Sequence, residues 1–181
     1  MFRLFRLGQK SDSAISYPLA PSDAPSGKEL SEQVPPERLY KIGHFYCDKS
    51  PHSHNGPYRH AIDLIVKDGT PVYAVKSGTV VDVVESNEKY GPNPSFKEYL
   101  NYITIDHGRF YSQYAHLKKG SPSTYGIYKG KKVVLGQIIG TTGKSGWMDF
   151  GERGDHLHFM LFRDTNSGFE SLPVQFEDPN P

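Results

Sequence analysis

Cysteine is nearly absent from this chain: Cys47 is the single one among 181 residues, which excludes an internal disulfide framework and any zinc finger built from several cysteines. Long apolar runs are also missing, and a stretch such as 80–84 is far too short to span a bilayer. Neither sign of charge dominates, because 21 Lys and Arg stand against 20 Asp and Glu. With no basic cluster, this balance argues against a nucleic-acid-binding protein.

Glycine, proline and tyrosine are plentiful, with 18, 14 and 12 residues, and no helical period of useful length is present. Short β-type runs separated by glycines indicate an all-β, mainly antiparallel sheet, sandwich or partly open barrel. Two hairpins are predicted, one around Ser77-Gly78 and one around His107-Gly108. The predicted strands are 61–66, 71–75, 79–84, 101–106, 110–114, 133–135, 137–139 and 156–162, with one helical turn over 95–100.

Residues 1–38 are predicted to be an N-terminal extension, either wrapping or flexible, because prolines recur among many Ser, Asp and Glu. Arg3 and Arg6 interrupt the first apolar residues, so this stretch does not have the form of a signal peptide. The folded domain is predicted to comprise 39–181. We expect a monomer.

Two histidines, His156 and His158, lie two apart in a predicted strand and therefore share one of its faces. Two imidazoles side by side favour a functional site over a core position, since each needs a polar partner when buried. Asp63 lies inside the apolar strand 61–66, where a carboxylate must be paired or bound to a metal. The alternative to a metal is a structural ion pair with Arg59, which lies four residues upstream of Asp63.

His116 follows the second strand of the 101–114 hairpin and completes a set of histidines and one carboxylate without cysteine. Such a set suits zinc bound by two histidines and one aspartate, with an open fourth position for water. The remaining histidines would then be available for proton transfer or charge stabilisation.

These residues lie within a longer pattern that resembles the lysostaphin/LytM-type zinc metallopeptidases. The similarity covers roughly 50–162, and its ordered combination is specific although each piece alone is weak. The matching segments are 59–64, 69–74, 77–80, 114–117, 136–140, 142–145 and 156–159.

The resemblance implies a zinc endopeptidase with Asp63 and His158 as metal ligands. It implies that His116 and His156 flank a metal-activated water and stabilise the tetrahedral intermediate. It further implies an antiparallel groove related to the barrel-sandwich hybrid, with long loops. The implied substrates are peptide bonds of bacterial peptidoglycan, in stem peptides or cross-bridges, which places the protein in the periplasm, at the cell surface or outside the cell.

The first metal ligand departs from the family pattern, because Arg59 occupies the usual histidine position four residues before Asp63. His60 would need a bulge to reach the same face as Asp63. His54 lies in a Pro- and Gly-containing loop that can fold back over the sheet, and it is the preferred candidate. If neither binds, Arg59 pairs with Asp63 and the site is inactive.

A second departure is the long segment 147–154, where Trp147 and Phe150 either line the groove or cover the edge of the core. The alternative function is an inactive relative that binds peptidoglycan or regulates a cell-wall amidase. A third hypothesis, a carrier-like β module with Lys76 at a hairpin tip, leaves the histidines unexplained.

Overall fold

The computed structural model describes residues 15–25, 38–48, 54–148 and 155–177. Thirteen strands and a few very short helices make up these parts of the chain. The strands are β1 (Leu39–Ile42), β2 (Phe45–Asp48), β3 (Ile62–Ile65), β4 (Pro71–Tyr73), β5 (Gly78–Val84), β6 (Tyr90–Gly91), β7 (Tyr102–Asp106), β8 (Tyr111–Ala115), β9 (Lys132–Val133), β10 (Ile138–Thr141), β11 (Gly146–Trp147), β12 (His156–Thr165) and β13 (Gly168–Leu172). The helices are η1 (Pro21–Asp23), η3 (Gly56–Tyr58), η4 (Pro94–Tyr99) and α2 (Ser121–Thr124).

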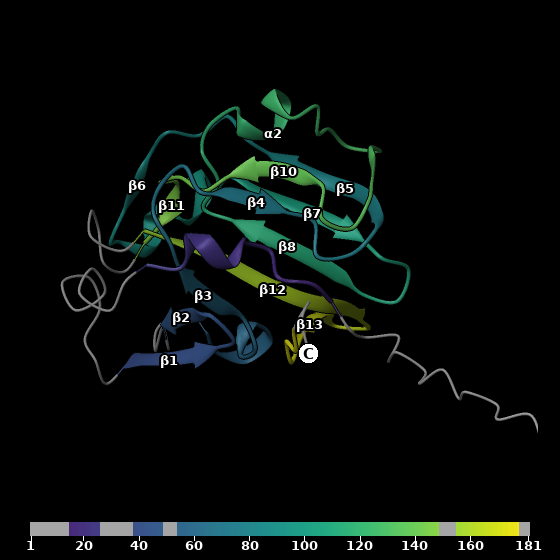
Figure 1. Ribbon diagram of the computed structural model, residues 1–181, viewed down its shortest axis with the longest axis horizontal. Coiled ribbons are helices and arrows are strands. Elements are labelled where there is room, and N and C mark those ends of the chain that lie inside the picture. Colours follow the sequence, from purple (N-terminus) through teal and green to yellow (C-terminus); the bar gives the residue numbers. More distant parts are fainter. Residues whose placement is uncertain (1–14, 26–37, 49–53, 149–154, 178–181) are drawn as a thin grey trace, which may run out of the picture.

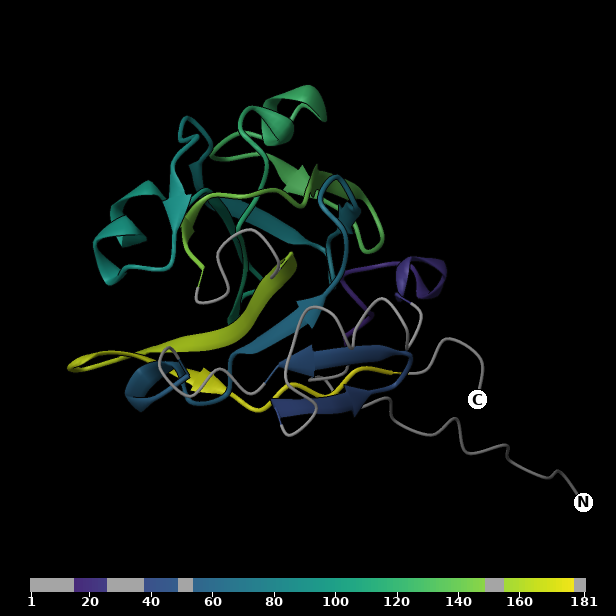
Figure 2. The same cartoon turned by 90° about the vertical axis from the view of Figure 1, so that its left-hand side faces the viewer.

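One large antiparallel sheet organises the molecule, in the order β1-β2-β3-β12-β8-β7-β5-β9, with β13 also paired to β12 (Figure 1). Figure 2 shows β12, the longest strand, running beside β3. Two small sheets complete the fold: β4 pairs with β10, and β6 pairs with β11 in parallel. The predicted all-β, mainly antiparallel fold is therefore confirmed. The helical turn expected over 95–100 is the 3-10 helix η4.

Of the two predicted hairpins, one is confirmed and one is wrong. Strands β7 and β8 form the expected hairpin around His107-Gly108. The strands on either side of Ser77-Gly78 do not pair, because β4 joins β10 while β5 joins β7 and β9. Segment 74–77 instead carries the chain between sheets, and the backbone N–H of its Val75 donates to the Tyr114 hydroxyl inside the core.

The hypothesis of a carrier-like module required a hairpin around Ser77-Gly78, and the structure does not form it. Lys76 is half-buried and its ammonium lies 5.5 Å from the centre of the Phe110 ring, so it is not presented at an exposed hairpin tip.

The main core lies between the large sheet and the small β4–β10 sheet, because Val72 and Ile139 are buried with residues of β7 and β12. Residues 15–25 of the predicted extension also pack here. Ile15 and Leu19 are buried in the same core, and Ser16 donates a backbone hydrogen bond to Val75. The domain boundary between residues 38 and 39 stays a prediction.

Strand β12 has two chemically different faces, as alternation predicts. Leu157, Phe159 and Leu161 point into the core and are almost completely buried. His156 and His158 therefore lie on the opposite face of the sheet, where the neighbouring strands provide polar partners. Within the described ranges, no helix is long and apolar enough to cross a membrane.

Cys47 on β2 is expected to be unreactive in the folded protein. Burial, followed by the negative charge of Asp63, raises the pKa of its thiol to about 12. The resulting fall in thiolate at pH 8 is about 1000-fold, and thiolate is the reactive form. A disulfide reagent should label no thiol in native protein and one per chain after unfolding in guanidinium, with glutathione as the control. Stoichiometric labelling of native protein would contradict this burial.

Candidate metal centre

Asp63 and His158 face each other because their strands are paired in register. Strands β3 and β12 are antiparallel, and Asp63 is the direct cross-strand partner of His158. The Nδ1 atom of His158 lies 2.8 Å from the Asp63 carboxylate. Two residues predicted from separate sequence patterns are thus brought together by one register of a central strand pair.

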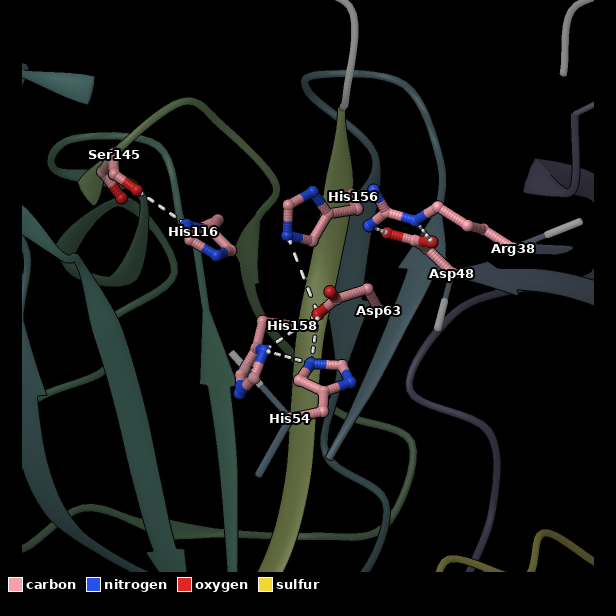
Figure 3. A network of polar contacts seen from close by, with 8 residues as sticks. All are labelled: Arg38, Asp48, His54, Asp63, His116, Ser145, His156 and His158. Carbon is pink, nitrogen blue, oxygen red and sulfur yellow. Dashed lines mark hydrogen bonds and ion pairs between the residues drawn. The ribbon is translucent and has the colours of Figure 1, made fainter. Parts of the chain in front are cut away.

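His54 reaches the same carboxylate from the loop that precedes η3 (Figure 3). Its Nε2 atom lies 3.2 Å from Oδ1 of Asp63 and 3.4 Å from Nδ1 of His158. All three ligand atoms lie within 4.8 Å of one another. Ligands of a tetrahedral zinc at ~2.1 Å lie about 3.4 Å apart, so this donor set fits zinc with little rearrangement.

His60 and Arg59 contact residues outside the three-residue cluster. The backbone N–H of His60 donates to the Ser171 hydroxyl, and the His60 ring accepts a hydrogen bond from Arg59. The Arg59 guanidinium also lies 3.9 Å from the Glu170 carboxylate. Among the described residues Arg59 forms no ion pair with Asp63, so the alternative in which Arg59 neutralises this carboxylate does not occur.

The electrostatics keep Asp63 ionised. Burial acts to raise the pKa of this carboxyl. The charge of His156 and hydrogen bonds from His158 and His54 outweigh burial and hold the pKa well below its usual range. An ionised carboxylate surrounded by imidazole nitrogens is a strong ligand set for a divalent cation.

His156 and His116 border this cluster on one side. The Nε2 atom of His156 lies 3.7 Å from Asp63, and the rings of His156 and His116 have centroids 4.5 Å apart. The Nδ1 atom of His116 lies 2.7 Å from the carbonyl oxygen of Ser145. Since a carbonyl only accepts, this nitrogen carries the proton, and Nε2 of a neutral ring is left as an acceptor.

The ring of His116 is neutral at ordinary pH. Burial, and then electrostatic interaction with His156 and His158, lowers its pKa to about 3. A neutral ring in a single tautomer presents its acceptor nitrogen, Nε2, at a defined position.

The backbone at His116 adopts an unusual conformation. Its φ of 60° is the only positive value at a non-glycine residue in the described chain. Such a conformation persists when its surroundings hold it, and it is frequent at functional sites. The carbonyl of His116 accepts a hydrogen bond from Gly143, where a Cβ atom would approach Lys118 backbone atoms to 2.4 Å. Gly143 thus permits the close chain crossing that holds His116.

Asn101 supports the same region and was not recognised in the sequence. It is fully buried, and its side chain bonds to the backbone of Asn87 and Leu117. Its backbone N–H donates to the hydroxyl of Ser145, whose carbonyl accepts from His116. Asn101 gave no separate signal because it begins an ordinary β-type run.

A second missed feature is an ion pair beside the cluster. Arg38 binds the carboxylate of Asp48 through two hydrogen bonds, of 2.8 and 2.6 Å (Figure 3). Asp48 is the cross-strand partner of Asp63. Burial raises the pKa of Asp48 although Arg38 opposes this effect. The guanidinium balances this second carboxylate, and Arg38 lay in the segment interpreted as an extension.

Of the two aromatic residues in segment 147–154, only Trp147 lies within the described residues; Phe150 lies outside them. Trp147 ends β11, donates its indole N–H to the carbonyl of Pro92, and has the Lys97 ammonium 4.7 Å from its ring centre. These contacts attach it to the η4 segment.

Asp63 and His158 on paired strands, joined by His54 from a loop, form a cluster of three potential ligands with two more imidazoles alongside, and such a cluster suits a single metal ion in a hydrolase. Comparison with known proteins agrees with this class. The model of peptidase family M23 matches residues 57–168, and the chain belongs to this family. The resemblance to lysostaphin/LytM-type peptidases is thereby confirmed. Membership of this family supports the prediction that the protein is a peptidase.

Individual relatives carry peptidase names. The chain is 32% identical over 154 residues to the peptidoglycan DD-endopeptidase ShyA of Vibrio cholerae, covering 83% of this chain and 29% of the relative. It is 34% identical over 142 residues to lysostaphin of Staphylococcus simulans, covering 78% and 24%. The chain thus spans less than a third of these relatives' lengths.

A solved structure supports the fold. A zinc-containing peptidase from Vibrio cholerae matches with a TM-score of 0.53 at 22% identity, over 91% of this chain and 40% of that one.

Proposed function

We propose that this protein is a zinc-dependent endopeptidase that hydrolyses peptide bonds in bacterial peptidoglycan. The observation that carries the proposal is the convergence of His54, Asp63 and His158 on one point, with His116 and His156 alongside. Membership of peptidase family M23 supports peptide hydrolysis, and the names of ShyA and lysostaphin support a cell-wall substrate. Action on peptidoglycan implies work outside the cytoplasmic membrane.

Each side chain has a distinct proposed role. His54, Asp63 and His158 hold the metal, which when bound lowers the pKa of water and polarises the scissile carbonyl. His116 accepts a proton at Nε2, because its Nδ1–H is committed to the Ser145 carbonyl. His156 stabilises the charge that develops on the substrate. Asn101 and Gly143 hold the chain segments from which His116 projects.

The second candidate function is an inactive relative that binds peptidoglycan or regulates an amidase. Loss of activity through an Arg59–Asp63 ion pair has no support, since Arg59 lies with Glu170 and His60. All five proposed site residues lie together, which favours the enzyme over the binding protein.

Purified protein is expected to contain one zinc per chain and to release peptide products from purified peptidoglycan. Elemental analysis gives the metal content, and mass spectrometry of the products distinguishes new amino termini from cleaved sugars. The His158→Ala variant, which removes a ligand from the central strand, is the control and should contain no stoichiometric zinc. Wild-type protein that sediments with peptidoglycan without zinc or cleavage would support the binding protein instead.

A further inference from the structure

A hollow lies on the same face of the large sheet as the candidate metal centre. It has a volume of about 260 Å³. Its lining residues are Tyr58, Asp82, Tyr102, Thr104, Gln113, Met160, Phe162 and Phe169. We call this hollow the Asp82 pocket.

Strand register connects the Asp82 pocket to the metal centre. One row across the sheet joins Asp63, His158, Ala115 and Tyr102 as successive cross-strand partners. Two residues further along the strands, a parallel row joins Met160, Gln113, Thr104 and Asp82. Because side chains two apart share a face, both rows open on the same side of the sheet.

The spacing of these rows suits an extended peptide. Asp82 is three strands away from Met160, which is ~14 Å at about 4.8 Å per strand. An extended peptide advances about 3.5 Å per residue, so roughly four residues span that distance. A peptide crossing the strands at the metal centre can therefore place a side chain in the Asp82 pocket.

Aromatic rings form one wall of the Asp82 pocket. The rings of Tyr58 and Phe169 meet edge to face with centroids 5.0 Å apart, and Phe162 contacts Phe169 at 5.5 Å. Met160, which is buried, contributes an apolar thioether. Rings and a thioether favour an alkyl chain, and the faces of the rings also attract a cation.

The opposite end of the Asp82 pocket carries a carboxylate without a cationic partner. Asp82 accepts a 2.7 Å hydrogen bond from the Tyr102 hydroxyl and one from the backbone N–H of Val83. No Lys, Arg or His among the described residues forms an ion pair with it, although the chain is rich in lysine. Burial, and then Asp82 itself, raise the pKa of Tyr102 to about 12, so the phenol keeps its proton and donates.

We propose that the Asp82 pocket binds a primary ammonium group carried on an alkyl side chain of the peptide substrate. Asp82 would accept hydrogen bonds from the ammonium, Tyr102 would fix the carboxylate, and the aromatic wall would hold the alkyl stem. This pocket selects substrates with a free amine at a fixed distance from the scissile bond. The inference rests on the proposed peptidase function of the same face, but ammonium binding is measurable without hydrolysis.

The test uses two probes on the full chain: Nα-acetyl-lysine methylamide and the same molecule acetylated at Nε. The chain has three methionines, so a ¹³C-methyl spectrum resolves Met160 in the pocket from buried Met148, which serves as the internal control. We expect Met160 to titrate with the free amine and at least about tenfold more weakly with the acetylated probe. Asp82→Asn should abolish this preference, whereas Glu88→Gln, an equal charge change at an exposed carboxylate paired with Lys119, should retain it.

The outcomes separate this inference from the proposed function. Equal binding of the two probes, or an unchanged preference in Asp82→Asn, would overturn the ammonium site even if the protein cleaves peptidoglycan. Selective binding of the free amine by a protein that cleaves nothing would support the ammonium site and refute the peptidase. Near-ultraviolet circular dichroism identifies a misfolded Asp82→Asn variant, and Tyr102→Phe then provides the second test, because it removes the donor to Asp82 but keeps the ring.

Discussion

The His54→Ala variant is expected to lose both stoichiometric zinc and peptidoglycan hydrolysis, while His60→Ala retains most of each. His54 supplies one of the three potential ligand atoms, together with Asp63 and His158, whereas His60 is engaged with Arg59 and Ser171. Loss of an outer-shell partner typically costs 10–100-fold in metal affinity, so loss of a ligand is expected to cost more than about 100-fold.

The two variants form a matched pair, because both remove a histidine from the same short region before β3. Zinc content after dialysis against a weak chelator gives the first comparison, and product release from peptidoglycan gives the second. Circular dichroism establishes that both variants fold. Zinc loss in His60→Ala with retention in His54→Ala would exchange the two assignments.

Substitution of His116 or His156 is expected to have the opposite profile, with zinc retained and hydrolysis reduced by ~10²–10⁴-fold. Neither residue belongs to the three-ligand cluster, and both rings lie beside it. The expected loss falls on kcat, because the role proposed for these groups is at the reacting atoms rather than at the metal.

The variant at position 116 needs a second form because of the backbone there. His116 has a φ of 60°, which alanine adopts reluctantly and asparagine tolerates. His116→Asn therefore removes the imidazole with little backbone change, and His116→Ala reports the added cost of the left-handed conformation. Metal content and single-turnover hydrolysis are measured for each. Unchanged turnover in His116→Asn and His156→Ala would mean that proton transfer resides elsewhere.

Local patterns predicted the parts of the fold that depend on local geometry. Alternation along β12 gave the shared face of His156 and His158, and a tight turn gave the β7–β8 hairpin. The loop around His54 was expected to fold back over the sheet, and it lies against Asp63. That His54 acts as a metal ligand stays a prediction, as do the roles of His116 and His156.

The features that sequence reasoning missed are the ones that long-range packing decides. Strand β4 carries the same local signals whether it pairs with β5 or with β10, and in the structure it pairs with β10 while Val72 is buried in the core. The Arg38–Asp48 ion pair joins a Pro-rich segment to a short strand, and neither residue signals the other. Asn101 acquires its role only after three distant loops converge on it.

The row of Asp63 and His158 is offset by two residues from the row of Met160 and Asp82, and with the proposed roles this offset separates chemistry from recognition in evolutionary terms. Substitutions in the second row can alter which substrates fit without disturbing the reactive centre, so one scaffold can diverge in specificity. Length changes within β12 do not have this freedom, because inserting one residue turns the ligand-bearing face into the core. We therefore expect inherited insertions and deletions near the centre to fall in the connecting loops, and diversification along β12 to proceed by replacement.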